Sequence, residues 1–387
     1  MSVYLDHNAT TPIEGRVLEA MLPYLKGGYG NPSSGHRLGR EAHQALQHAR
    51  EQVAMLVGVQ PMQVVFTSGG TEANNLALKG VMAIAAAGSE LVVSAIEHSS
   101  VLQSAYALQT AGCPLTIADV DDDCVVKSAG FEQAVSGRNV VLASVMLANN
   151  ETGAVQDVAQ LSEIAKHRGV LMHTDAVQAL GKMAVDFGAL GVAAMSLSAH
   201  KIYGPKGIGA LVIEKGVALQ PMLHGGGHEA GLRAGTENVA GIVGFGAAAE
   251  LMQLDLDQRT KHCEQLRQYA EQALRKMPEV VIFSQQAKRL PNTVFFAVKG
   301  IEGATLLMSL DRDGFAVSSG SACASGSGSG SGKPSHVLQA MGVEDGLAHG
   351  AIRVSLGSGN TIEEVDRLIS SLQQQIESLL KLNSGWA

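Results

Sequence analysis

The sequence predicts an α/β protein in which helices cover both faces of a mostly parallel β-sheet. Two observations support this prediction. Along the first half of the chain, short apolar or β-branched runs alternate with helical patterns of about 10–15 residues. After residue 236 the pattern changes to one long helix and then to a smaller α+β unit. The length of 387 residues suggests two or three domains and is ample for a large core.

Each element follows from the period of its apolar residues. The segment 41–57 has helical spacing, because Leu46, Ala49 and Val53 fall on or near one face. The helix expected from 236 to 277 is apolar all round in its first half, which indicates burial, and amphipathic in its second half. Such a helix could bridge two domains. Further helices are expected at 71–87, 158–167 and 361–382, and strands at 64–66, 91–93, 140–145, 170–173, 196–202 and 209–213.

Composition excludes several classes of protein. The net charge of −8 argues against direct nucleic-acid binding, which needs a basic surface. The four cysteines, Cys113, Cys124, Cys263 and Cys323, form no CxxC pair and lack zinc spacing, so we expect no metal site. Reduced thiols and an N-terminus without a signal-peptide pattern favour a cytoplasmic protein. The longest uncharged apolar stretch, 239–249, is too short for a membrane span.

Glycine is in excess, with 45 residues where the usual frequency would give about 27. This excess predicts loops in which bare backbone is required. One run, GSGSGSG at 326–332, has the composition of a flexible linker and fits either a natural loop or an engineered insertion.

Polar residues follow several of the expected strands, where α/β sheets place their ligands. The sequence TSGGTEANN at 67–75 opens a helix and predicts either an anion site on free backbone N–H groups or an ordinary helix cap. Asp175 is either a ligand-facing carboxylate or a cap. Lys201 is either a nucleophile or a surface lysine at a turn. His98 taken alone is more typical of a structural histidine.

Taken together, these residues favour a pyridoxal phosphate (PLP) site. Such a site needs a phosphate cradle, an acidic partner for the pyridinium nitrogen and a lysine that forms a Schiff base. Nucleotide-binding folds are disfavoured, because no GxGxxG follows a strand. The stretch ending at Lys333 also fails the P-loop pattern, since Pro334 stands where Ser or Thr is required.

Ten sequence motifs span nearly the whole chain. They are LDHNATTP (5–12), GNPSSGH (30–36), TSGGTEANN (67–75), EHSSV (97–101), NNETG (149–153), HTDAVQ (173–178), SAHKIYGPKGIG (198–209), RAGTEN (233–238), SSGSAC (318–323) and IRVSLG (352–357). With these motifs in the family's order, the chain resembles the NifS/IscS-like cysteine desulfurases of the class V aminotransferase fold. The resemblance implies the PLP-dependent transferase fold type I. It implies a large domain (13–255) with a mostly parallel seven-stranded sheet, and a smaller α+β domain (1–12 and 256–387).

The resemblance also implies roles for individual residues. Lys201 matches the lysine that carries PLP, Asp175 matches the partner of its pyridinium nitrogen, and His98 matches the histidine stacked on its ring. Arg353 matches the clamp on the substrate carboxylate. Further matched residues are Gln178 at the ring's phenolic oxygen, Gly70, Thr71, Ser198 and His200 at the phosphate, Thr236 reaching the phosphate of a neighbouring subunit, and Asn150 and Asn31 as helpers of the substrate clamp.

Cys323 matches the family's nucleophile, on a loop at about 318–334. The implied reaction converts L-cysteine to L-alanine, with Lys201 as the main base. The sulfur passes to Cys323 as a persulfide and then to an acceptor protein, such as an iron–sulfur scaffold or a thiolation relay. The implied protein is a homodimer. Cys113, Cys124 and Cys263 are interpreted as small apolar residues or surface thiols, with Cys263 a candidate for exposure in a polar helix.

Two departures from the family pattern affect partners more than chemistry. The segment after Cys323 is about four residues longer than usual, and a flexible chain from 320 to 334 would span roughly 20 Å. We expect this loop to be disordered without a partner and to carry Cys323 between PLP and an acceptor. Ala230 stands where arginine is common, which puts acceptor docking in doubt.

The alternatives are a selenocysteine lyase, another class V PLP enzyme and a non-catalytic scaffold. The SSGSAC context of Cys323 favours desulfuration. A scaffold would have no use for the full set of Lys201, Asp175, His98, Arg353 and Cys323.

Overall fold

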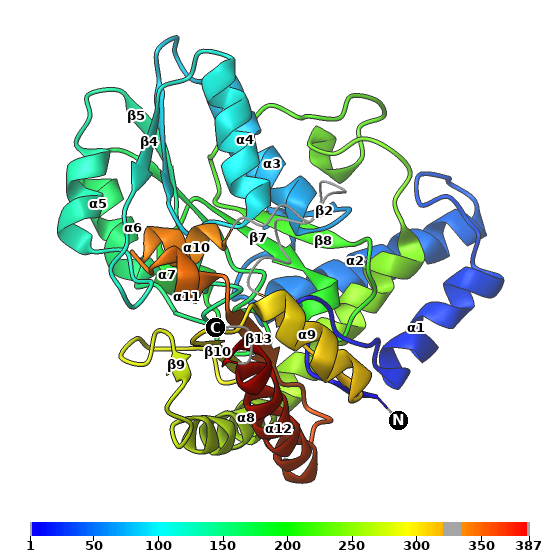
Figure 1. Cartoon of the computed structure of the whole chain (residues 1–387). Coiled ribbons are helices and arrows are strands. Elements are labelled where there is room, and N and C mark those ends of the chain that lie inside the picture. Colours follow the sequence, from blue (N-terminus) through cyan, green and yellow to red (C-terminus); the bar gives the residue numbers. More distant parts are fainter. Residues whose placement is uncertain (1, 320–333, 385–387) are drawn as a thin grey trace.

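The chain is described by a computed structural model over residues 2–319 and 334–384. Among these residues, a seven-stranded sheet runs in the order β2-β8-β7-β6-β5-β3-β4 (Figure 1). Its strands are β2 (Val64–Thr67), β3 (Glu90–Ser94), β4 (Leu115–Ala118), β5 (Val140–Ser144), β6 (Leu171–Asp175), β7 (Ala194–Ser198) and β8 (Gly209–Ile213). Strands β3 to β7 are mutually parallel, whereas β8 is antiparallel to β7 and β2. The predicted fold class is therefore confirmed.

Helices cover both faces of this sheet because strand side chains alternate between the faces. On β2, Val64 and Phe66 enter a core shared with α1, α2, α6 and α8, whereas Val65 enters the opposite core with α3 and α4. The helices around the sheet are α1 (Gly15–Lys26), α2 (Arg37–Leu56), α3 (Gly70–Ile84), α4 (Ser99–Thr110), α5 (Ser128–Val135), α6 (Val158–His167), α7 (Phe187–Leu190) and α8 (Val239–Leu274). Short 3₁₀ turns occur at η1 (Pro61–Gln63), η2 (Ala199–Lys201) and η3 (Glu229–Gly231).

A second sheet in the described residues has the order β12-β13-β10-β9. Its strands are β9 (Val280–Ile282), β10 (Thr293–Val298), β12 (Ser318–Ser319) and β13 (Ala351–Ser355), and β1 (Val3–Tyr4) pairs in parallel with β11 (Phe315–Ala316). The accompanying helices are α9 (Gly303–Arg312), α10 (His336–Ala340), α11 (Asp345–Ala348) and α12 (Ile362–Ser384). This unit has its own core, in which Phe296 of β10 and Leu372 of α12 are fully buried.

The long helix α8 contributes to both cores, through Phe245 near its start and Leu266 further along. The chain crosses residue 255 inside this continuous helix. The division at 12/13 and 255/256 stays a prediction.

The structure corrects the expectation that no segment is long and apolar enough for a membrane span. Of the helices in the described chain, α8 passes that test by length and composition, because it continues well beyond the 239–249 run. Its apolar window is 56% buried, and α1 and α2 pack against it. Such burial is typical of a core helix.

Two strand predictions are also corrected. The strand expected at 196–202 ends at Ser198, and the next three residues form the turn η2, closed by the Ile202 N–H donating to the Ala199 carbonyl. Strand β4 was missed because it lies at the sheet edge, with Ile117 exposed, so its residues do not form a buried apolar run. The helix expected from 236 begins at Val239, where the Asn238 side chain accepts a hydrogen bond from the Gly241 N–H.

Candidate active site

A cavity of about 280 Å³ is lined by residues that end or follow the parallel strands. Asp175 ends β6, Ser198 ends β7, and His98 follows β3 at the start of α4. Carboxyl ends of parallel strands meet at one edge of a sheet, which brings these distant residues together. The predicted site residues that line the cavity are Gly70, Thr71, His98, Asn150, Asp175, Gln178, Ser198, His200 and Lys201.

Asp175 is held by two donors at the wall of this cavity. Its Oδ2 accepts a hydrogen bond of 2.6 Å from Asn74 Nδ2, and its Oδ1 accepts one of 2.9 Å from the Val177 N–H. Asn74 Nδ2 also lies 2.8 Å from Ser100 Oγ, which links α3 to α4. The carboxyl group is therefore fixed in orientation, as a partner for a ring nitrogen must be.

His98 begins α4 and is held by Ser100. Its Nδ1 accepts a hydrogen bond of 3.1 Å from the Ser100 N–H and lies 2.7 Å from Ser100 Oγ. Burial lowers the pKa of His98, and the opposing effect of Asp175 is smaller. Because Nδ1 accepts the N–H, its proton is on Nε2 when the ring is neutral.

Lys201 ends the turn η2 and lines the cavity. Its Nζ donates hydrogen bonds to the backbone carbonyls of Asn8 and, over 2.8 Å, of Ala9. The Asn8 carbonyl also accepts a hydrogen bond of 2.9 Å from Gln178 Nε2. The N-terminal segment therefore positions both the lysine and the amide beside it.

Behind Gln178 lies a buried amine, Lys182. Its Nζ lies 2.7 Å from Gln178 Oε1 and 2.9 Å from Asn8 Oδ1. The bond from Lys182 fixes Oε1 of the Gln178 amide towards the amine, so that Nε2 of the same amide donates to the Asn8 carbonyl. Burial lowers the pKa of Lys182 well below its ordinary value, and the charges of Lys201 and Arg353 lower it further.

The other end of the cavity suits an anion. Helix α3 starts there, and Gly69, the residue before it, has no side chain to cap the free N–H groups. At Gly70, an added methyl group would lie 2.8 Å from Val177 Cγ2, so any larger residue would force the valine side chain to move. Burial lowers the pKa of His200 to about 4, which leaves a neutral imidazole. Thr71 and Ser198 line the cavity beside it.

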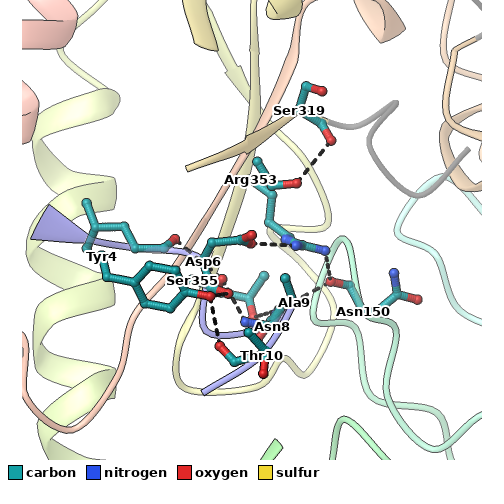
Figure 2. Close-up of polar contacts among 12 residues, drawn as sticks. Tyr4, Asp6, Asn8, Ala9, Thr10, Asn150, Ser319, Arg353 and Ser355 are labelled. Atoms are coloured by element: carbon teal, nitrogen blue, oxygen red, sulfur yellow. Dashed lines mark hydrogen bonds and ion pairs between the residues drawn. The ribbon is translucent and has the colours of Figure 1, made fainter. Parts of the chain in front are cut away.

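Arg353 lies next to the cavity without lining it. It is 4% exposed, and its Nη1 donates a hydrogen bond of 3.0 Å to the Asn150 carbonyl (Figure 2). Its Nη2 lies 2.7 Å from Asp6 Oδ1. Asn150 therefore connects the predicted substrate clamp with the cavity.

The structure does not bring Asn31 or Thr236 into this cavity. Asn31 is exposed and lines a separate hollow of about 1190 Å³, where its Oδ1 accepts a hydrogen bond from the Ser33 N–H. Thr236 is exposed just before α8.

Cys323 and the predicted disorder of its loop lie outside the described residues. Among the other cysteines, Cys124 and Cys263 are buried and Cys113 is half-buried, which corrects the expectation that Cys263 is exposed. Burial raises the pKa of Cys124 to about 12 and that of Cys263 to about 11. Such thiols are poor nucleophiles, because the thiolate is the reactive form.

Five polar site residues were not predicted from the sequence: Asp6, Asn8, Asn74, Ser100 and Lys182. Four of them stand inside quoted motifs, but nothing in a motif says which neighbour holds the functional group. Lys182 lies beyond the end of HTDAVQ and has no signal other than a single charge in an apolar run.

Comparison with known proteins identifies the family of the chain. The model of the aminotransferase class-V family matches residues 3–368, and the chain belongs to this family. Cysteine desulfurase IscS of Dictyoglomus turgidum is 43% identical over 97% of this chain and 95% of its own. The solved structure of a NifS-like protein has a TM-score of 0.90 at 39% identity, covering 99% of this chain and all of that one. SspA in complex with cysteine has a TM-score of 0.82 at 31% identity, covering 93% of this chain and all of that one.

Enzymes of this family depend on PLP, and the residues present fit that cofactor. The cavity has a fixed carboxyl group at one side and an uncapped helix start at the other. Lys201 lies on its wall to hold an aldehyde, and His98 and Gln178 complete the lining. This donor set matches a phosphorylated pyridine aldehyde.

Proposed function

We propose that the protein is a cysteine desulfurase, which converts L-cysteine to L-alanine and transfers the sulfur to Cys323. The observation that carries the proposal is the cavity in which Lys201, Asp175 and His98 meet, next to the guanidinium of Arg353. The names of relatives at 39–43% identity support it.

Each site residue has a role that is set by its position. Lys201 would hold the cofactor, and its amine would be the base that takes the proton from the substrate's α-carbon. Asp175, fixed by Asn74, would hold a proton on the ring nitrogen of the cofactor. Arg353 binds the substrate carboxylate and so orients the amino group towards Lys201. PLP, when bound, accepts the negative charge that develops on the substrate.

The sulfur step belongs to Cys323. Its thiolate attacks the substrate sulfur, and an S–S bond forms as the Cβ–S bond of the substrate breaks. The electron pair of the broken bond goes to the substrate carbon, which takes up a proton and becomes the methyl group of alanine. The resulting Cys323 persulfide is then passed to an acceptor protein. The buried thiols of Cys124 and Cys263 are unsuited to this step.

The proposed enzyme is a cytoplasmic homodimer. Thr236 is exposed and lies outside its own cavity, as a residue that completes a neighbouring site would. The proposed acceptor is an iron–sulfur scaffold or a thiolation relay. Trapping acceptors with the persulfidated protein would identify it.

A Cys323→Ala variant tests the proposal. We expect it to keep the yellow colour of the loaded protein and to lose sulfide release from cysteine, whereas Cys113→Ala keeps both. Lys201→Ala is expected to lose the cofactor's visible absorbance band. Sulfide release by Cys323→Ala at the wild-type rate would defeat the assignment. Turnover of selenocysteine with none of cysteine would indicate a selenocysteine lyase, and a colourless protein that gains no band with PLP would indicate a scaffold.

A further inference from the structure

Arg353 is a buried cation with a single directly bound carboxylate in the described structure. It lies on β13, between β12 and β10, with 4% of its surface exposed. Asp6 accepts a hydrogen bond from Nη2, and the neutral Asn150 carbonyl accepts one from Nη1 (Figure 2). Asp6 is therefore the resident counterion of the proposed substrate clamp.

The third nitrogen of Arg353 is unused. Nε is buried and has no acceptor among the described residues. In a planar guanidinium, Nε and Nη2 form one edge, which matches the two oxygens of a carboxylate. Half of that edge is taken by Asp6 and half is vacant. A substrate carboxylate that binds the whole edge must take Nη2 from Asp6.

The backbone of Asp6 cannot move away, but its side chain can. The chain around it is tied to β13: the His7 N–H donates to the Ser355 carbonyl over 3.1 Å, and the Asn8 N–H donates to Ser355 Oγ over 2.9 Å. The Asp6 side chain is 21% exposed, against 4% for that of Arg353. Rotation about its side-chain bonds therefore returns the carboxylate to water while the arginine stays buried.

We propose that Asp6 is an exchangeable counterion, which holds Arg353 in place in the empty site and is displaced from Nη2 by the carboxylate of the substrate. This inference rests on the proposed function, because it takes Arg353 as the carboxylate clamp. Asp6 acts through Arg353 and is a positioning residue. Its removal leaves Arg353 with only a neutral partner, and a buried cation without a counterion binds an incoming anion more tightly.

The exchange limits the affinity for every carboxylate that enters the site, including that of the product. Substrate and alanine carry the same α-carboxylate, so both must displace the same Asp6. A competing counterion keeps the product from remaining bound, because Asp6 returns to Nη2 when alanine leaves. The expected signature is a parallel change in the KM for cysteine and the inhibition constant for alanine.

The test measures carboxylate binding without cofactor chemistry. Isothermal titration calorimetry of the loaded enzyme compares 3-mercaptopropionate with 3-mercaptopropionamide, which lack the amino group and differ only in the carboxylate. For Asp6→Asn we expect the dissociation constant of the acid to fall about tenfold, equivalent to about 1.4 kcal/mol, with that of the amide unchanged. Asp6→Glu, which keeps the charge, should stay near the wild type. Asp6→Ser is the second neutral variant and should bind the acid more tightly as Asp6→Asn does.

Enzyme kinetics supply the second readout. In Asp6→Asn, the KM for cysteine and the inhibition constant for alanine should both fall, while kcat does not rise. If the wild type prefers the acid over the amide but neither neutral variant binds the acid more tightly, the exchange is wrong and the proposed function stands. If the wild type shows no preference for the acid, the clamp role of Arg353 fails and the inference fails with it.

Discussion

Glu97 is a fully buried carboxyl group next to His98, and its ionisation should set much of the protein's pH-dependent stability. Oε1 accepts hydrogen bonds of 2.6 Å from Ser94 Oγ and from the Met146 N–H, whereas Oε2 is buried without a partner in the described residues. Burial raises the pKa of Glu97 from 4.5 to about 8, more than its hydrogen bonds lower it. The side chain is therefore protonated at neutral pH.

The direction of this pH dependence follows from the number of protons that the folded and the unfolded chain bind. Between pH 4.5 and about 8 the unfolded chain loses the Glu97 proton and the folded chain keeps it, so the folded state is progressively destabilised as pH rises. At about 1.36 kcal/mol per pH unit, the loss approaches about 5 kcal/mol above pH 8. The substitution Glu97→Gln keeps an acceptor for both hydrogen bonds and cannot ionise. Its stability relative to the wild type should rise by about 3 kcal/mol between pH 4.5 and pH 7.

Urea unfolding, followed by circular dichroism at several pH values from 4.5 to 9, measures this difference. The free-energy cost of burying an amide at position 97 is the same at every pH. The test is therefore how the difference in unfolding free energy between variant and wild type changes with pH. The control is Glu163→Gln on the exposed side of α6, whose difference from wild type should stay within about 0.5 kcal/mol. Parallel stability curves for Glu97→Gln and the wild type would refute the reasoning.

Three further substitutions test other parts of the structure. Asn74→Ala removes the donor to Asp175 and should raise the dissociation constant of PLP about tenfold in an absorbance titration, whereas Asn75→Ala on the same helix should not. Lys182→Met removes an amine whose pKa is lowered by burial. The variant should be more stable than the wild type at pH 7, and this difference should shrink as pH rises towards 10.5, because the wild type is stabilised over that range. A difference that stays constant with pH would contradict this. Ala230 has φ 56° and ψ 25°, so Ala230→Gly should raise stability by up to about 1 kcal/mol, read as a higher urea midpoint; a lower midpoint would contradict the strain.

The sequence predicted the fold where periodicity was strong. Strands such as 209–213 are buried on both faces and form apolar runs. The carboxyl ends of the parallel strands, such as the end of β6 at Asp175, coincide with the site because α/β sheets bind ligands there. The edge strand β4 has no such run, since Ile117 is exposed and Thr116 is only half-buried. The end of β7 at Ser198 also could not be read, because the turn after it depends on hydrogen bonds rather than on a change in hydropathy.

The sequence predicted which residues form the site, but it did not predict the side chains that hydrogen-bond to them. The motifs identified Asp175 and Arg353, yet their partners Asn74 and Asp6 lie 101 and 347 residues away along the chain. Folding creates these pairs, so no local pattern records them.

The N-terminal segment joins the two parts of the site. Asp6 contacts Arg353 on the four-stranded sheet, while the carbonyls of Asn8 and Ala9 accept from Lys201 beside the seven-stranded sheet. Within a few residues, one turn of the chain therefore contacts both the substrate clamp and the cofactor lysine. A shift that releases Asp6 from Arg353 without moving the backbone leaves Lys201 in place, because the tethers to Lys201 are main-chain carbonyls. Exchange of the counterion can therefore admit a carboxylate without disturbing the lysine that must act on it.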